Sequence, residues 1–268
     1  MRKLIASDLD GTLLRPGTIL SDVAIAGIES LKRRKQAIAI ASGRTFEEIQ
    51  AICSPLALSE YEHAYWIGYN GVEVRKADTG KVVYGVRFDW TVVKTVWNRV
   101  RELGMHMHVF TDHSVYLTKG IRETLHIVRD GWNVTEIDMQ SFSTDEPVLK
   151  IVVLDTPEHC DRLRSSLDET VLAMTSAFKS ADMLAEFVPK GGTKGDALKA
   201  LAQHLGIDPI DVYAFGDEEN DKTMLAYAGH GIAMKNAKPV ILKMGLEITE
   251  SNAQDGVVLA LKRHGIID

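Results

Sequence analysis

Short apolar runs that alternate with helical patterns constrain the fold of this chain most. Four such runs are KLIAS (3–7), AIAIAS (37–42), DVYAFG (211–216) and GIAM (231–234). Between them, apolar residues recur at helical spacing, as in residues 196–206, where a glycine ends the pattern. Strands buried on both faces and separated by helices form a parallel sheet with right-handed crossovers. The sequence therefore predicts an α/β fold with a Rossmann-like parallel sheet core.

The middle of the chain follows a different pattern. Within residues 106–117, and again within residues 171–188, one apolar run follows another with no helical pattern between the two runs, which predicts an antiparallel strand pair in each range. Helical patterns occur near 91–103, 121–129 and 158–168. Because the α/β pattern resumes afterwards, we expect an inserted α+β cap domain over residues 83–187, within a catalytic core made of 1–82 and 188–268.

Charge and composition exclude several kinds of partner. The net charge of -6 argues against nucleic acid and against anionic membrane surfaces, because both require a basic face. No apolar run approaches the roughly 18 residues that a membrane span needs. Cys53 and Cys160 lie far apart and match no metal-ligand spacing, so we expect them to be reduced. These features predict a cytoplasmic protein, and no obligate protein partner is implied.

Polar and charged residues follow the strands of the predicted α/β part. In an open parallel sheet, ligands bind beyond the carboxyl ends of the strands. Asp8 and Asp10 follow the first strand. The other candidates are Ser42, Gly43 and Arg44 after the second strand, Thr193 and Lys194 at the start of a helix, and Asp217, Asn220 and Asp221 after the strand at 211–216. These residues are predicted to meet at one edge of the sheet.

Each motif taken alone has an ordinary structural explanation. DLDG (8–11) equally fits a turn with helix-capping aspartates, and the acids of 217–221 equally fit a helix N-terminus. GGTKG (191–195) lacks the GxxxxGK[ST] spacing, so a P-loop is excluded. The occurrence of all the motifs in order, each at the end of an element, favours a single site.

The residue types of this set indicate phosphoryl chemistry with a metal ion. Asp8 and Asp10 alternate with Leu9, so in an extended segment both carboxylates face the same way. Two carboxylates this close raise each other's pKa unless a cation that is also bound by Asp217 offsets the repulsion. An all-oxygen ligand set suits Mg²⁺. Ser42, the backbone N–H groups near Gly43, and Lys194 are suited to hold phosphoryl oxygens.

Four motifs, in this order, resemble those of the haloacid dehalogenase-like phosphohydrolases: DLDGTLL (8–14), SGR (42–44), KG (194–195) and GDEEND (216–221). The long insertion after the second motif is similar to the Cof-type branch with its large inserted cap. YNGVEV (69–74), GIAMKNA (231–237) and TESNAQDGV (249–257) also fit this family. The second motif has Ser42 where threonine is common in the family, and the hydroxyl donor is kept.

The resemblance implies a role for each acid. Asp8 would be the nucleophile that forms an aspartyl-phosphate, and Asp10 would protonate the leaving group and then activate water. Mg²⁺ would be bound by the Asp8 carboxylate, the Asp10 backbone carbonyl and Asp217, and Asp221 would orient that shell.

The resemblance further implies that Ser42, Gly43 and Lys194 bind the transferred group, that Asn220 assists near the phosphate, and that Arg44 reaches the substrate. The expected activity is Mg²⁺-dependent hydrolysis of a small phosphorylated metabolite, such as a sugar phosphate. A phosphomutase that uses the same aspartyl-phosphate remains an alternative. So does a non-catalytic phosphoacceptor signalling protein, although that class lacks a hundred-residue insertion and needs no acid of the Asp10 type.

Overall fold

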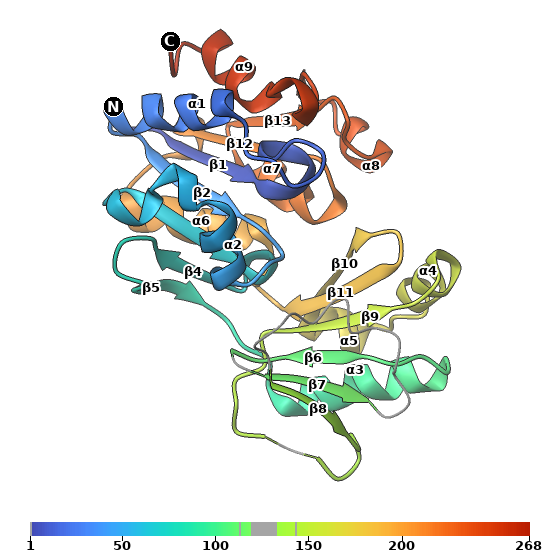
Figure 1. Cartoon of the computed structure of the whole chain (residues 1–268). Helices are drawn as coiled ribbons and strands as arrows, with labels where there is room; N and C mark the ends of the chain where they lie inside the picture. Colours follow the sequence, from blue (N-terminus) through green and yellow to red (C-terminus); the bar gives the residue numbers. More distant parts are fainter. Residues whose placement is uncertain (1, 113, 119–132, 143) are drawn as a thin grey trace. The chain divides into compact units, whose positions relative to one another are not determined.

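The computed structural model describes residues 2–112, 114–118, 133–142 and 144–268 (Figure 1). The chain divides into two compact units, one made of Met1–Gly85 together with Thr193–Asp268 and the other of Val86–Gly192. The second unit is therefore inserted between two halves of the first. Its role as a cap stays a prediction.

An eight-stranded sheet forms the centre of the first unit. Its strands are β1 (Leu4–Asp8), β2 (Ala37–Ala41), β3 (Ala64–Gly68), β4 (Glu73–Lys76), β5 (Val82–Gly85), β12 (Val212–Gly216), β13 (His230–Met234) and β14 (Glu247–Thr249). The strand order is β14-β13-β12-β1-β2-β3-β4-β5, and all neighbours are parallel except β4 and β5 at one edge. The predicted α/β class with a parallel sheet is confirmed.

Helices cover both faces of this sheet. They are α1 (Asp22–Arg33), α2 (Phe46–Ile52), α6 (Lys194–Leu205), α7 (Lys222–Tyr227), α8 (Pro239–Leu242) and α9 (Gly256–Arg263). On one face, α6 and α7 pack through Leu198 and Met224 on small strand residues such as Ala39 and Ala214. On the other face, α1 contacts β2, α2 contacts β3, and α9 contacts α1. β1, β2 and β12 are buried at every position, and burial of both faces explains why their residues before the strand ends are mainly apolar.

A six-stranded sheet forms the second unit, in the order β10-β11-β9-β6-β7-β8. Its strands are β6 (His108–Phe110), β7 (Ser114–Thr118), β8 (Asn133–Ile137), β9 (Lys150–Leu154), β10 (Thr175–Ala181) and β11 (Leu184–Pro189), and its helices are α3 (Trp90–Glu102), α4 (Pro157–Ser165) and α5 (Glu169–Met174). Val96 of α3 and Val171 of α5 share a hydrophobic cluster with Ile151 and Phe187 of the sheet. β6 pairs with β7 and β10 with β11 in antiparallel fashion, as predicted.

Two features of the second unit differ from the prediction or fall outside it. The apolar run at 171–174 is the end of helix α5 and not a strand, because the Asp168 side chain accepts the Val171 N–H and starts a helix there. The strand begins only at Thr175. The helix predicted near 121–129 lies outside the described residues.

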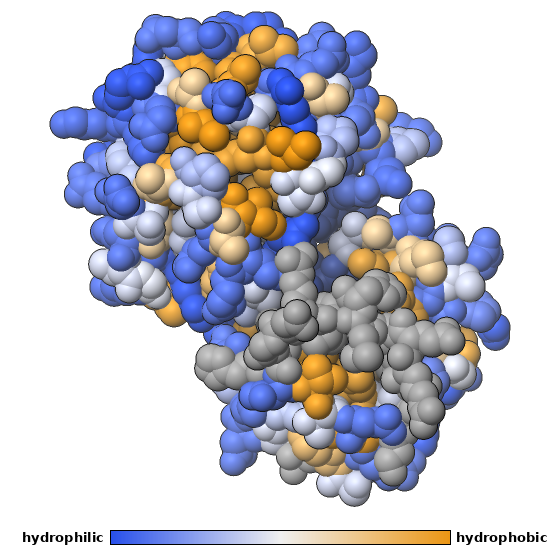
Figure 2. Space-filling view, viewed as in Figure 1, coloured by the Kyte–Doolittle hydropathy of each residue, from blue (hydrophilic) through white to orange (hydrophobic). Residues whose placement is uncertain are grey.

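Hydrophilic residues surround the periphery of the first unit on the face that Figure 2 shows, with hydrophobic residues interspersed toward the middle. Across the ranges that the structure describes, each helix is too short or too polar to span a bilayer.

Candidate active site

Three buried aspartates meet at the carboxyl ends of two neighbouring strands. Asp8 ends β1, Asp217 directly follows β12, and Asp221 lies in the short turn Glu219–Asp221 that leads into α7. β1 and β12 are adjacent and parallel, with Ser7 paired to Phe215, so their ends lie at one edge of the sheet. One carboxylate oxygen of each aspartate lies within 4.8 Å of the others. The structure thus brings together acids that are more than two hundred residues apart.

Lys194 joins two of these aspartates. It is the first residue of α6, and Thr193 fixes that helix start through a capping box with Asp196. Lys194 Nζ lies 2.6 Å from Asp8 Oδ1 and 2.6 Å from Asp221 Oδ1. Burial alone would lower the pKa of Lys194, but the charges of Asp221 and Asp8 outweigh it and hold the pKa above its ordinary value. Lys194 is therefore an ammonium ion inside the protein.

Asp221 has both carboxylate oxygens occupied by donors. Oδ1 accepts from Lys194, and Oδ2 accepts the backbone N–H groups of Asp217 at 2.9 Å and Glu218 at 3.0 Å. Gly216 is required beside it, because a Cβ there would lie 2.5 Å from the Asp221 Cβ. These contacts make Asp221 a residue that orients Lys194 and the loop of Asp217.

Two residues that follow β1, Gly11 and Thr12, fix the position of the Asp217 carboxylate. Its Oδ1 accepts from Thr12 Oγ1 at 2.7 Å. Gly11 has φ +80°, and a Cβ on it would lie 2.3 Å from Asp217 Oδ2, so only glycine fits. Burial, reinforced by the negative charge of Asp221, raises the pKa of Asp217 to about 7. A carboxylate with this pKa is stabilised by any cation that binds next to it.

The acid cluster carries more negative charge than Lys194 compensates. Burial raises the pKa of Asp8; Lys194 opposes this, and Asp221 and Asp217 add to it. When ionised, three buried carboxylates and one ammonium group have a net negative charge, which a further cation would offset. The donors are all oxygens, which is the set that Mg²⁺ prefers, so the residues present fit that ion.

Asp10 follows the end of β1 and has other partners than Asp8. The Asp10 carboxylate, about half exposed, accepts two hydrogen bonds of 2.7 Å from Arg44 Nε and a terminal nitrogen. The Asp10 side chain therefore does not belong to the acid cluster. Arg44, which was predicted to reach the substrate, contacts Asp10.

The segment after β2 lies beside the acid cluster, because β2 pairs with β1 and Ala41 lies opposite Asp8. Ser42 is buried, with 1% of its surface exposed, and its Oγ accepts the Arg44 N–H at 3.3 Å. Asn220 approaches from the turn after β12 and donates from Nδ2 to Asn70 Oδ1 at 2.9 Å. All four segments that carry the predicted site residues therefore belong to the first unit.

Sequence reasoning missed two residues of this region. Thr12 orients Asp217, and Asn70 binds Asn220. A signal existed for both: Thr12 lies within the DLDGTLL segment, and Asn70 lies within YNGVEV, directly after a strand of the sheet.

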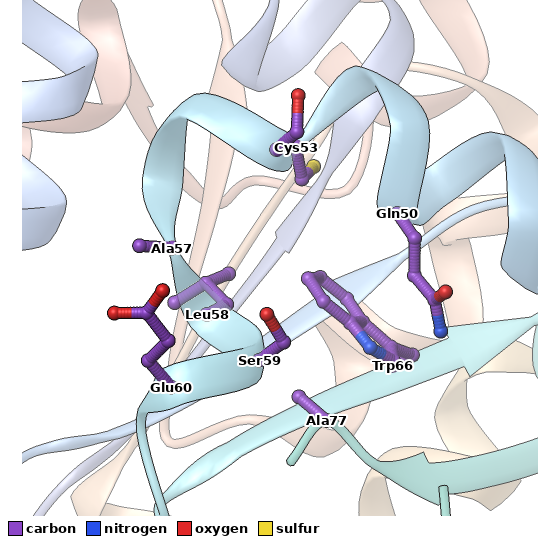
Figure 3. Close-up of a pocket in the computed structure, with 9 residues that line it drawn as sticks. Gln50, Cys53, Ala57, Leu58, Ser59, Glu60, Trp66 and Ala77 are labelled. Atoms are coloured by element: carbon purple, nitrogen blue, oxygen red, sulfur yellow. The ribbon is translucent and has the colours of Figure 1, made fainter.

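A separate pocket of about 210 Å³ lies between α2, two short helical turns and β3 (Figure 3). Gln50, Cys53, Ser59, Glu60 and Trp66 are among its lining residues. The pocket shares no residue with the acid cluster. Burial raises the pKa of Cys53 to about 12, so its thiol is protonated and a poor nucleophile at neutral pH.

The parallel core, the inserted unit and the acids at the strand ends together match the architecture that the sequence motifs resemble. The haloacid dehalogenase-like hydrolase family matches residues 5–261. The chain belongs to this family and is an enzyme of hydrolase type.

Individual relatives extend over nearly the whole chain. A Bacillus subtilis protein named "Putative phosphatase YxeH" is 30% identical over 97% of each chain. A crystal structure from Thermotoga maritima is 28% identical, with a TM-score of 0.78 over 98% of this chain and 97% of that one. A structure described as a sugar phosphatase of haloacid dehalogenase subclass IIB is 23% identical, with a TM-score of 0.80 over 99% and 100% of the two chains, and this shows a shared fold.

Proposed function

We propose that the protein is a Mg²⁺-dependent phosphatase that hydrolyses a small phosphorylated metabolite through an aspartyl-phosphate on Asp8. The observation that carries this proposal is the meeting of Asp8, Asp217 and Asp221 around the Lys194 ammonium at the carboxyl edge of the sheet. The family membership and the relatives named as phosphatases support the same reaction class.

Asp8 is the proposed nucleophile. Its contact with Lys194 opposes the rise in the pKa of Asp8 that burial causes, and a bound cation would further favour the ionised carboxylate, whose oxygen attacks phosphorus. Asp10 is the proposed acid and base: it donates a proton to the leaving oxygen and then removes one from the attacking water. Arg44 holds the Asp10 carboxylate in the ligand-free protein, and we infer that the substrate displaces this contact.

Asp8, Asp217 and the backbone carbonyl of Asp10 are the proposed ligands of Mg²⁺, with Asp221 orienting them. When bound, Mg²⁺ would neutralise charge that develops on the transferred phosphoryl group. Ser42, the N–H groups near Gly43, and Lys194 are the proposed phosphoryl-binding groups, and Asn220 borders the same space. Hydrogen-bond donors held in advance at these positions stabilise the transition state without reorganisation.

The proposed substrate class is a sugar phosphate, supported by the fold shared with the subclass IIB sugar phosphatase. We propose that the inserted unit selects the leaving group and excludes water during the reaction.

A cytoplasmic location is supported by two free cysteines, Cys53 and Cys160, both buried.

A hydrolysis screen tests this function. Purified protein is incubated with a panel of phosphorylated sugars, nucleotides and cofactors, and free phosphate is measured with Mg²⁺, with chelator, and after Mg²⁺ is restored. We expect release of phosphate from at least one sugar phosphate, loss of the activity with chelator, and its return with Mg²⁺. Conversion of a hexose monophosphate to an isomer without free phosphate would identify a phosphomutase. Full activity in chelator would contradict the metal dependence.

The stabilising effect of Mg²⁺ should depend on pH. The folded-state pKa of Asp217, about 7, lies above the ordinary value. Between these two pKa values the metal-free folded protein keeps a proton that the unfolded chain loses. Its free energy of unfolding therefore falls as pH rises toward 7. Mg²⁺ needs the ionised form, so its apparent affinity should fall about tenfold for each pH unit below the pKa. Thermal unfolding with and without Mg²⁺ should show a larger stabilisation at about pH 8 than at about pH 6. An equal stabilisation by Mg²⁺ at both pH values would contradict the proposal that Asp217 binds the ion.

A further inference from the structure

The turn Tyr69–Gly71, between β3 and β4, has an uncommon backbone. Its three residues have φ values of +52°, +65° and +109° in succession. Left-handed conformations are rare for residues with side chains and persist only where the surroundings impose them. Tyr69 and Asn70 are buried, with 2% and 0% of their surfaces exposed. The contacts that hold this turn therefore come from the protein interior.

The first set of contacts is with the segment Ser42–Arg44. The Tyr69 N–H donates to the Arg44 carbonyl at 3.0 Å, and the Asn70 N–H donates to the Ser42 carbonyl at 2.9 Å. A Cβ on Gly43 would lie 2.9 Å from Asn70 Oδ1, so glycine is needed for this close approach. The turn thus fixes the backbone of the loop that carries the proposed phosphoryl-binding N–H groups.

The second contact is with Asn220. Its Nδ2 donates to Asn70 Oδ1 at 2.9 Å, which fixes the plane of the Asn220 amide. The other amide atom, Asn220 Oδ1, is buried and has no hydrogen-bond partner in the described part of the chain. A buried polar atom without a protein partner is costly unless water or a ligand satisfies it. Asn70 therefore fixes an amide whose second Nδ2 hydrogen can donate to a phosphoryl oxygen, while Oδ1, which only accepts, calls for a donor such as water or a substrate hydroxyl.

The third contact is with the start of α6. A Cβ on Gly71 would lie 2.2 Å from the Thr193 carbonyl carbon and 2.5 Å from the Lys194 nitrogen. Backbone therefore packs directly against backbone at the residue whose side chain joins Asp8 and Asp221. The single turn Tyr69–Gly71 contacts three of the four segments that make up the proposed site.

We infer that Asn70 is a positioning residue for phosphoryl binding, which acts through the amide of Asn220 and through the backbone of Ser42 and Gly43. This inference rests on the proposed function. The left-handed backbone at Asn70 lets one residue use its N–H toward Ser42 and its side chain toward Asn220 at the same time. Glycine would keep this backbone and lose the side-chain contacts of Asn70, including the one with Asn220.

A double-mutant cycle on phosphate affinity tests the inference. Binding of inorganic phosphate in the presence of Mg²⁺ is measured by calorimetry for the wild type, Asn70→Gly, Asn220→Ala and the double variant. Each single change should weaken binding about tenfold, and the double variant should be no weaker than Asn220→Ala, because Asn70 acts through Asn220. Ala57→Gly, at another left-handed residue with φ +46°, is the matched control and should leave binding unchanged. Additive losses, or no loss for Asn70→Gly, would overturn the inference.

A second readout does not depend on phosphate chemistry. Hydrogen exchange of the Asn220 side-chain amide, followed by NMR and assigned with Asn220→Ala, should be slow in the wild type and much faster in Asn70→Gly. Asn70→Asp keeps an acceptor and tolerates the left-handed backbone, so it should retain the protection. If the wild type neither binds phosphate nor hydrolyses esters, the proposed function fails, while the exchange experiment still decides whether Asn70 holds Asn220. Unchanged exchange in Asn70→Gly would refute the positioning role.

Discussion

Replacing Asp8 by asparagine should reduce phosphatase turnover by about 10⁴-fold or more while leaving the fold intact. The amide is nearly the same size as the carboxylate and is a very poor nucleophile toward phosphorus. Because burial and the neighbouring acids raise the pKa of Asp8, removal of its charge should not destabilise the metal-free protein. The measurements are initial rates on the best ester from the screen and the thermal midpoint of the variant.

Asp161→Asn is a suitable control for this experiment, since Asp161 lies on the surface of the second unit and pairs with Lys179. It should keep wild-type turnover. Covalent trapping adds a direct observation: brief incubation of the wild type with labelled substrate should place phosphate on the protein, and Asp8→Asn should carry none. Near-native turnover of Asp8→Asn would remove Asp8 from the mechanism.

Replacing Lys194 by methionine should lower the free energy of unfolding by about 3–5 kcal/mol and abolish activity. Methionine fills a similar volume, so the main loss is charge. Lys194 is completely buried between Asp8 and Asp221, and without it these carboxylates lose the ammonium group that bridges them. Denaturant unfolding of both proteins without Mg²⁺ measures the loss.

Mg²⁺ should recover part of the stability of Lys194→Met, because a second cation then offsets the same acids. Lys235→Met provides the comparison, since the Lys235 side chain is 65% exposed and forms a surface pair with Glu250, for which a change of less than about 1 kcal/mol is expected. A change of similar size in both variants would show that Lys194 does not hold the acids together.

The main strands of the core were predictable from the sequence because burial on both faces leaves uninterrupted apolar runs. β1, β2 and β12 are buried along their whole length, and β13 is buried over its last three residues. Strand β3 was not among the predicted strands, although its sequence, AYWIG, is equally buried and the YNGVEV motif follows it directly. The run at 171–174 was misread because four apolar residues do not distinguish a strand from a short helix, and the cap of Asp168 decides for the helix.

The positions of the site residues followed from topology, since the carboxyl ends of adjacent parallel strands share an edge. The contact partners of individual side chains within the site could not be predicted. Asp8 and Asp10 are separated by one residue, yet one is buried against Lys194 and the other reaches Arg44. The left-handed Gly11 after them packs on Asp217, and neither this contact nor the choice of partners has a signature in the spacing of the acids.

The discontinuous first unit has a consequence for the order in which the protein matures. During synthesis the ribosome completes Val86–Gly192, a continuous segment able to fold as a unit, before it makes any of Thr193–Asp268. Until then β1 lacks its neighbour β12, and Asp8 lacks Lys194, Asp217 and Asp221. The proposed site is therefore incomplete until Thr193–Asp268 has been synthesised, and before that point a nascent chain should neither bind the proposed Mg²⁺ nor attack phosphate esters.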